Sequence, residues 1–245
     1  MFWALDPSAA LYLQDRNYTM YFNPSYYSND EFAVYHTEKY IKLMAERPKF
    51  WRTVLQTGYD MLFLDSDIIF FKNPQLDLIG DADLEGQIDE FELEQALDPD
   101  FYPEMCGGGF FLKSNERSVT FLNELERLLI LRPDGIIDDQ QAINRIIHNT
   151  TLARIINRKS PSEPDERLSV RYIPFQQYLN GWLFRSHSYA QILKPHKMTY
   201  VINGTMETFE PSLVHLNGAN PEGGKLGLMK KFGWWDLYDN HTCRH

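Results

Sequence analysis

Residues 61–74 read Met-Leu-Phe-Leu-Asp-Ser-Asp-Ile-Ile-Phe-Phe-Lys-Asn-Pro, so two apolar runs flank an Asp-Ser-Asp segment. A short apolar run that is entered from Gly58 and closed by an Asn-Pro pair is typical of a buried strand in a parallel sheet. Ligands bind at the carboxyl ends of such strands. If the backbone turns there, Asp65 and Asp67 can face one divalent cation, and their oxygens suit Mg²⁺ or Mn²⁺. Taken alone, the pair fits a solvated strand end equally well.

The composition bounds the class of protein and its partners. The chain has 245 residues, of which 43% are hydrophobic and 14% aromatic. It can therefore bury one sizeable core, and we expect a single domain over residues 1–245. The formal net charge of -10 leaves no basic stripe that could track phosphates, which argues against a nucleic-acid partner. A nucleotide ligand needs only a few local cations or a metal, so it stays compatible with this charge.

The start of the chain bears on targeting. No window approaches ~18 consecutive apolar residues, so we expect no membrane span in the sequence. Residues 1–6 lack the basic start and long apolar core of a signal peptide, and they already resemble a strand. We therefore expect an N-terminally truncated sequence from which a targeting segment or membrane anchor is missing.

Cysteines and glycosylation sequons indicate the compartment. The two cysteines, Cys106 and Cys243, are too few for a disulfide scaffold; they could form one bridge or stay as two buried thiols. Chance would give about one Asn-x-Thr sequon, so an excess favours the lumen of the secretory pathway. Four sequons are present, at Asn17, Asn149, Asn203 and Asn240.

Four helices can be predicted around residues 37–147. Thr37 can cap a helix to about Glu46, and Pro48 suits the first position of a further helix that ends at Gly58. Apolar residues at helical spacing predict another helix over residues 116–131. A last one follows Asp138, a plausible N-cap, and places its first turn where side chains could point into a site.

Residues 75–104 form an acidic stretch that is poor in β-branched residues. Such a run is usually a solvated face or a mobile loop. Because loops at the carboxyl end of a strand often carry substrate contacts, Asp83 and Asp89 are minor candidates for the site.

A glycine triplet, Gly107 to Gly109, follows Cys106 and enters an apolar strand. Adjacent glycines permit close approach of the backbone to a ligand, and they serve equally well in a bulge or in tight packing. Gly108 and Gly109 are therefore weak candidates for sugar binding.

The last part of the chain supplies a histidine and a lysine. His215 ends an apolar strand, and a Gly pair with Lys225 follows within ten residues. A neutral imidazole could complete the coordination of a metal held by two Asp residues, although a lone histidine is more often structural. A flexible glycine-rich turn with a lysine could neutralise a diphosphate. A metal and a lysine are what a nucleotide-diphosphate leaving group requires.

Taken together, these residues resemble the nucleotide-diphospho-sugar transferase domain family of GT-A glycosyltransferases, which includes plant cell-wall xylosyl- and arabinosyltransferases. The resemblance spans about residues 2–235 and rests on five segments in order. These are Ala4-Leu5-Asp6, Arg47-Pro48, Gly58-Tyr59 with Asp65-Ser66-Asp67 and Asn73-Pro74, Asp139-Gln140 with Asn144, and His215-x-Asn217 with Gly224-Lys225 and Trp234.

The resemblance implies a GT-A (Rossmann-like) α/β fold with a mostly parallel sheet flanked by helices. It also implies retaining transfer from a nucleotide sugar, such as a UDP-sugar, to a glycan or glycoprotein with Mn²⁺ (or Mg²⁺), in the Golgi lumen. Asp65, Asp67 and His215 would bind the metal. Asp6, Arg47, Ser66, Gly224 and Lys225 would bind the nucleotide diphosphate, and Asp139 and Gln140 would lie beside the anomeric carbon as catalytic residues.

Two alternatives remain open. A haloacid-dehalogenase-like phosphatase also places Asp-x-Asp after an apolar strand, with the first Asp as nucleophile. A catalytically inactive, carbohydrate-binding relative would keep the fold without turnover. The strand that usually precedes Ala-Leu-Asp in the family is missing here, which supports that reading.

Overall fold

The structure is a computed structural model in which residues 1–24, 37–73, 82–89, 103–132, 138–155, 166–181, 192–193, 197–202, 205–217, 224–231 and 233 are described. The elements are β1 (Phe2–Trp3), α1 (Pro7–Asp15), β2 (Met20–Tyr21), α2 (Glu38–Leu55), β3 (Met61–Leu64), β4 (Ile68–Phe70), β5 (Leu84–Ile88), β6 (Met105–Leu112), α5 (Glu116–Leu131), α6 (Asp139–Ile147), β7 (Ala153–Ile155), β8 (Leu168–Ile173), β9 (Tyr178–Asn180), β10 (Ile192–Leu193), β11 (Lys197–Ile202), β12 (Thr205–Phe209), β13 (Leu213–His215) and α7 (Gly224–Lys231).

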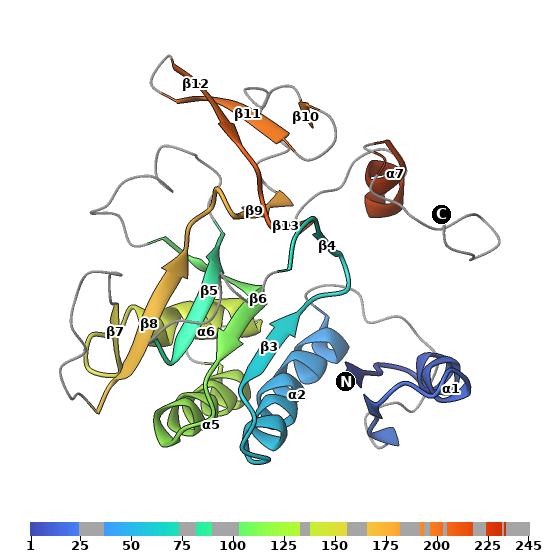
Figure 1. Ribbon diagram of the computed structural model, residues 1–245. Coiled ribbons are helices and arrows are strands. Elements are labelled where there is room, and N and C mark those ends of the chain that lie inside the picture. The colour runs from blue at the N-terminus through green and yellow to red at the C-terminus, as the bar shows by residue number, and fades with distance from the viewer. Residues whose placement is uncertain are drawn as a thin grey trace.

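The central sheet has the order β3-β6-β5-β8-β7. Strand β5 pairs in parallel with β8, which pairs in parallel with β7. Strand β6 runs antiparallel to both of its neighbours, β3 and β5, so β3 again shares the direction of β5. All strands of this sheet except β6 therefore point the same way, and the expected α/β fold with a mostly parallel sheet is confirmed (Figure 1).

Strand β3 differs in one respect from the sequence prediction. It lies at the end of the sheet beside the reversed strand β6, and only Met61 among its residues is fully buried. The apolar side chains of β3 pack on both faces of the sheet, but at its edge and not in the middle of parallel neighbours. The apolar sequence predicts the strand correctly but not its neighbour, because pairing partners come from distant segments.

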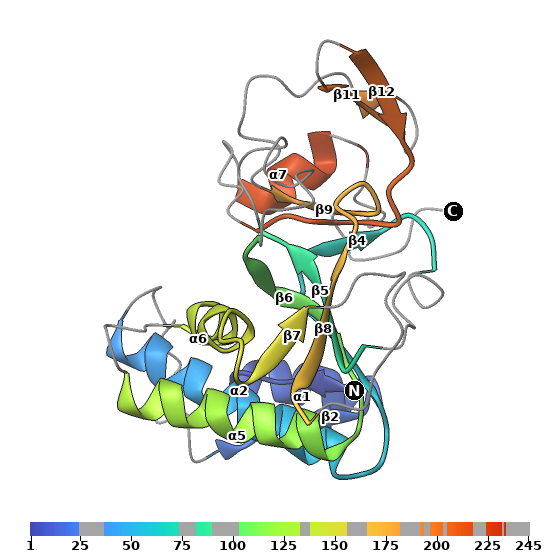
Figure 2. The same ribbon diagram turned by 90° about the vertical axis from the view of Figure 1, so that its left-hand side faces the viewer.

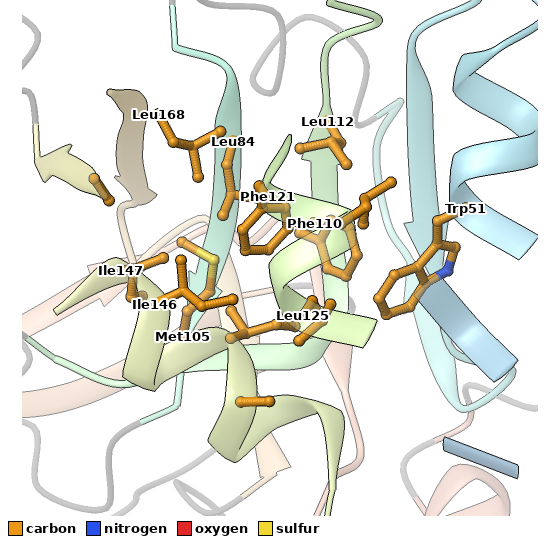
Figure 3. Packing of buried hydrophobic residues seen from close by; sticks show 14 of the residues in the cluster. Trp51, Leu84, Met105, Phe110, Leu112, Phe121, Leu125, Ile146, Ile147 and Leu168 are labelled. Carbon is orange, nitrogen blue, oxygen red and sulfur yellow. The ribbon is translucent and has the colours of Figure 1, made fainter. Parts of the chain in front are cut away.

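Helices α2, α5 and α6 cover one face of the sheet, which Figure 2 views from the β7 edge. Their apolar faces meet the side chains of β5, β6 and β8 in one continuous cluster (Figure 3). Trp51 is fully buried and its ring meets that of Phe110 edge-on, with 5.0 Å between centroids. Removing a buried indole of this kind typically costs about 3–5 kcal/mol of stability.

A second sheet, β4-β13-β9, packs on the other face and fixes the site. Strand β13 pairs antiparallel with β4 and parallel with β9. A small apolar cluster formed by Phe111, Ile173, Tyr178 and Leu213 joins the two sheets. Strands β10, β11 and β12 form a separate antiparallel sheet that extends away from the body of the molecule (Figure 1).

Three local predictions are wrong. Residues 38–55 form one helix with Pro48 inside it, because Trp51, Leu55 and other buried side chains on both sides of Pro48 hold the turn together. The acidic stretch is not all loop, since β5 runs through it with every residue buried. The predicted flexible turn is wrong at Gly224 and Lys225, which begin helix α7; residues 218–223 lie outside the described residues. No helix in the described ranges is long and apolar enough to cross a membrane.

Candidate active site

The two aspartates lie in the turn between β3 and β4. The Asp65 amide N–H donates to the carbonyl of Gly108 at 2.8 Å, which continues the β3–β6 ladder by one residue. The amide of Ile68 then donates back to the Asp65 carbonyl at 3.4 Å, so the chain reverses over Ser66 and Asp67. This turn directs both carboxylates towards β13. It is the backbone turn that Asp65 and Asp67 need in order to face one shared ligand.

His215 completes the group from the other sheet. In the β4–β13 register His215 stands opposite Ile68, and the Leu216 amide donates to the Asp67 carbonyl at 3.1 Å. The imidazole Nε2 lies 3.2 Å from Asp67 Oδ1 and 3.9 Å from Asp65 Oδ2. One ligand atom from each of the three residues lies within 4.8 Å of the other two.

These donors fit a divalent cation. Carboxylate oxygens are hard ligands and an imidazole nitrogen is an intermediate one, and together they suit Mn²⁺ or Mg²⁺. Three protein ligands leave coordination positions open for a phosphate. His215 is buried, whereas the side chain of Asp65 is 30% exposed, so the group has one covered and one open side. A ligand could therefore reach a cation held here.

The electrostatics of the two aspartates differ. Burial works against ionisation of Asp67, but hydrogen bonds and positive charge from His215 and Lys225 outweigh it and hold the pKa of Asp67 below its usual range. Burial raises the pKa of Asp65, and the charges of Arg47 and His215 offset only part of that rise. A bound cation would favour the ionised form of Asp65 as well, because it would add positive charge next to the carboxylate.

Lys225 reaches the group from helix α7. Its Nζ donates to Asp67 Oδ2, and its side chain is 44% exposed. Gly224 begins α7 with a φ of +67°, and a Cβ there would meet nothing within 4 Å. The left-handed backbone favours glycine at this position, and the first turn of α7 lies next to the aspartates.

Arg47 lies beneath the aspartates and joins two candidate residues. Its guanidinium donates to Asp139 Oδ2 at 2.8 Å and to Asp65 Oδ1 at 3.2 Å. Burial opposes the charge of Arg47, but Asp139 and Asp65 outweigh it and raise the pKa of Arg47 above its ordinary value. The arginine thus remains a cation that holds two carboxylates, one from the β3–β4 turn and one from α6.

Gln140 and Asp89 meet in a polar network beside this pair. The Gln140 amide oxygen accepts from the Gly107 N–H at 3.0 Å, and its nitrogen donates to Asp89 Oδ2 at 2.6 Å. The other oxygen of Asp89 accepts from Asn217, whose own oxygen accepts from the Gly181 N–H at 2.6 Å. Gln140 and Asp89 are therefore hydrogen-bonded to each other, to the backbone of Gly107 and to the side chain of Asn217.

Two glycines of the triplet make room for neighbouring side chains. A Cβ on Gly108 would come within 2.4 Å of His215 Cε1 and 2.5 Å of Asp65 Oδ2. A Cβ on Gly107 would lie 3.1 Å from the Gln140 side chain. For Gly109 the nearest atom would be Gln87 Oε1 at 3.4 Å, an ordinary contact. Gly107 and Gly108 are thus closely packed against neighbouring side chains, whereas Gly109 has space for a methyl group.

Two more buried residues contact His215, and sequence reasoning missed both. Gln87 Oε1 lies 3.2 Å and Cys106 Sγ 3.3 Å from His215 Nδ1. Cys106 is a free thiol, and its burial raises the pKa of that thiol well above the ordinary value, so the sulfur is neutral. Cys243, the other half of the possible bridge, lies outside the described residues.

A signal for Gln87 does exist in the sequence. Leu84, Gly86 and Ile88 alternate with polar residues at Glu85 and Gln87. This period of two predicts a strand with one polar face. The acidic composition of the surrounding stretch concealed it.

Asp83, a minor candidate, serves the fold instead. Its carboxylate is 1% exposed and bonds to Arg117 and Asn115 near the start of α5 and to Ser169 of β8. It ties a helix to two strands, and it does not belong to the group around His215.

A cleft of about 860 Å³ opens beside the aspartates. This volume is in the range of small-molecule sites. Its walls come from the N-terminal segment, from α2, from β3 with its following turn, which includes the exposed Ser66, and from Lys225. Asp6 lies next to the cleft wall but is occupied as the N-cap of α1, where Oδ1 accepts from the Ala9 N–H at 2.7 Å.

The sequence profile of the nucleotide-diphospho-sugar transferase family matches residues 1–229, nearly the whole chain. The chain belongs to this family. The match includes every residue that holds the metal group and the cleft, and it favours a transferase over a haloacid-dehalogenase-like phosphatase. Of the residues in the expected family segments of this nucleotide-diphospho-sugar transferase, Pro74 and Trp234 lie outside the described residues.

A curated relative extends the comparison. This nucleotide-diphospho-sugar transferase is 23% identical over 202 residues to the UDP-galactose:fucoside alpha-3-galactosyltransferase of Dictyostelium discoideum. The alignment covers 80% of this chain and 28% of the relative. The chain therefore spans little more than a quarter of the length of that protein.

Proposed function

We propose that the chain is a metal-dependent glycosyltransferase that moves a sugar from a nucleotide-diphosphate sugar to a glycan or glycoprotein. The observation that carries the proposal is the convergence of Asp65, Asp67 and His215 at the mouth of a cleft, in a chain of this family. Mn²⁺ or Mg²⁺ is the cofactor that we propose for these three ligands.

The cation and Lys225 would act on the leaving group. As the bond from the sugar carbon to the phosphate oxygen breaks, negative charge builds on the diphosphate. A divalent cation at the aspartates would neutralise part of this charge. Lys225 already lies against Asp67, so its ammonium group can move from the carboxylate to a phosphate oxygen without leaving the site.

The donor would lie along the cleft. Its wall brings Ser66, residues 1–3 and Leu5 next to the aspartates, which supports a nucleotide bound between the N-terminal segment and β3. Asp139 and Gln140, on the opposite side of Arg47, are the residues that we propose beside the anomeric carbon. Their contacts to Arg47 and Gly107 would hold them in place during the reaction. Retention of configuration is part of this proposal through the family resemblance.

The donor is proposed as a UDP-sugar, and the name of the curated relative supports a hexose such as galactose. The proposed location is the Golgi or another secretory compartment. The exposed sequon residues Asn17 and Asn149 support a glycosylated, lumenal protein. Asn203 and Asn240 lie outside the described residues.

Thermal melting with UDP and Mn²⁺, separately and together, tests the proposal. A ligand that binds only the native state raises stability by mass action, by about 2.7 kcal/mol at a hundred times its Kd. We expect UDP and Mn²⁺ together to raise the melting temperature by more than the sum of their separate effects. We expect this rise to be lost in Asp67→Ala. The matched control, Asp15→Ala, removes an exposed carboxylate of α1 and should keep the shift.

Donor hydrolysis separates the competing functions. A transferase slowly hydrolyses its UDP-sugar, whereas a phosphatase prefers phosphomonoesters. Melting shifts without hydrolysis of any UDP-sugar or transfer to any glycan would favour the inactive, carbohydrate-binding relative. A well-folded protein that shows no shift with UDP and Mn²⁺ together would refute the nucleotide-sugar proposal.

A further inference from the structure

Gln87 is fully enclosed beneath the imidazole of His215. It lies on β5, its side chain is 1% exposed, and it contacts three other segments. Its amide nitrogen donates to the carbonyls of Leu179 at 2.6 Å and Tyr178 at 3.3 Å. Its amide oxygen lies 3.2 Å from His215 Nδ1.

The two carbonyls fix the orientation of the amide. If the group were flipped, its oxygen would face the carbonyl oxygens of Leu179 and Tyr178 and would be buried there without a donor. Such groups cost about 1–3 kcal/mol each when they are left unpaired. The Gln87 oxygen must therefore face the imidazole, and it can only accept a hydrogen bond.

The orientation of Gln87 in turn fixes the tautomer of His215. A buried amide oxygen at 3.2 Å requires a proton on Nδ1, so Nε2, which faces Asp67 Oδ1 and Asp65 Oδ2, is the ring nitrogen that can give its lone pair to a cation. A cation that takes the place of any proton on Nε2 would then receive electron pairs from all three residues. Metal-binding histidines usually donate their other ring N–H to such a partner, which orients the ring and raises its basicity.

We propose that Gln87 is a positioning residue for the metal centre: by accepting from Nδ1 of His215, it presents Nε2 to a divalent cation held with Asp65 and Asp67. This inference rests on the proposed function, because it assigns a role towards the same cation. Gln87 touches neither the cation nor the substrate, and it acts through the imidazole alone.

Cys106 is the competing partner of Nδ1 and provides the matched control. Its sulfur lies 3.3 Å from Nδ1, but it also accepts from the Asn217 amide at 3.7 Å, and a neutral thiol is a weak acceptor. The amide oxygen of Gln87 is the stronger partner. Replacing Cys106 should therefore leave the metal site intact, whereas replacing Gln87 should not.

The test measures Mn²⁺ binding to the metal-free protein by the loss of the free-ion EPR signal, with no substrate present. Gln87→Met keeps the size of the side chain and removes the acceptor. We expect Mn²⁺ affinity to fall about 10- to 100-fold in Gln87→Met, the range for lost partners of metal ligands. Cys106→Ala should bind like the wild type. Circular dichroism melting confirms that each variant is folded.

A second measurement needs no variant of Gln87. In wild-type protein labelled with ¹⁵N-histidine and saturated with diamagnetic Zn²⁺, NMR identifies which ring nitrogen of His215 carries a proton. The His215 signals are assigned by their loss in His215→Ala. A proton on Nδ1 supports the inference, and a proton on Nε2 with Nδ1 bare overturns it, even if Gln87→Met does not fold.

The outcomes separate this inference from the proposed function. If the wild type binds Mn²⁺ and folded Gln87→Met binds it equally well, the role of Gln87 is refuted and the metal centre remains. If Cys106→Ala alone loses affinity, the thiol is the partner of Nδ1 and the inference is likewise refuted. If the wild type binds no Mn²⁺, both the metal centre and the role of Gln87 fail.

Discussion

Gly108 leaves no space for a side chain between the two segments that carry the candidate metal ligands. A Cβ would overlap both the imidazole of His215 and the carboxylate of Asp65. We expect Gly108→Ala to push these ligands apart, to weaken Mn²⁺ binding at least about tenfold, and to cost about 1–3 kcal/mol of stability through overpacking. EPR titration and urea unfolding measure the two effects.

Gly109→Ala is the matched control, because its nearest neighbour would lie at an ordinary contact distance. It adds the same methyl group to the next residue of β6. Equal loss of metal binding in both variants would show that the strand, and not the space beside the ligands, is sensitive to substitution.

Arg47 binds two carboxylates from different elements, so we expect Arg47→Ala and Arg47→Lys to reduce stability by different amounts. Arg47→Ala leaves Asp139, whose side chain is 4% exposed, without its cation. Breaking a buried ion pair from one side costs about 3–5 kcal/mol. Arg47→Lys should recover only part of the loss, because one ammonium group cannot match the planar fork that reaches both Asp139 and Asp65. Urea unfolding of the two variants measures this; full recovery by lysine would contradict it.

At the scale of the elements, Asp83 ties α5 to β5 and β8 and should make the fold sensitive to acid. Burial opposes ionisation of Asp83, but Arg117, Ser169 and Asn115 outweigh it and lower the pKa of Asp83 to about 2. An unfolded aspartate has a pKa of about 3.9. The ionised group therefore stabilises the fold above about pH 4, by about 2 kcal/mol, and this contribution is lost as the pH falls through about 2.

Urea unfolding of the wild type and Asp83→Asn across this pH range checks the prediction. The wild type should be more stable at pH 7, and the difference should narrow as the pH falls from about 4 towards 2. A difference that does not change with pH would show that Asp83 contributes through packing and neutral hydrogen bonds alone.

The elements also show what the sequence could and could not predict. Asp65 and Asp67 follow a compact apolar run, and the caps at Thr37 and Asp138 are local signals, so the sequence predicts these features. Helix α2 was divided at Pro48, because the burial that keeps the helix continuous comes from segments far along the chain. The tertiary contacts decided the structure against the local propensity of proline.

The candidate site also has features that the sequence predicts and features that it does not. Its ligand types could be predicted from spacing, because Asp-x-Asp and a histidine at a strand end are each visible in a few residues. The contacts of Arg47 with Asp139 and of Gln87 with His215 join residues 92 and 128 positions apart. Such pairs depend on sheet order and register, which a single sequence does not determine.

At the scale of the whole molecule, the cleft is built from parts that lie far apart in the chain. Its walls include residues 1–3, residues 60–68 and Lys225. We expect UDP with Mn²⁺ to slow amide hydrogen exchange in all three regions at once, because bound ligand suppresses their opening. Protection confined to residues 60–68 would place the nucleotide outside the cleft, on the turn alone.

The pairing of β4 with β13 has a consequence for how the protein folds. It joins residues 68–70 to residues 213–215, so the chain must close a very long loop before the three candidate ligands meet. Strand β13 leaves the ribosome after all the strands of the central sheet, and long-range pairing is slow to form. The metal centre is therefore assembled on a core that can already be in place. A cation that bridges the two segments should mainly slow unfolding and leave the folding rate unchanged, since its contacts form after the transition state.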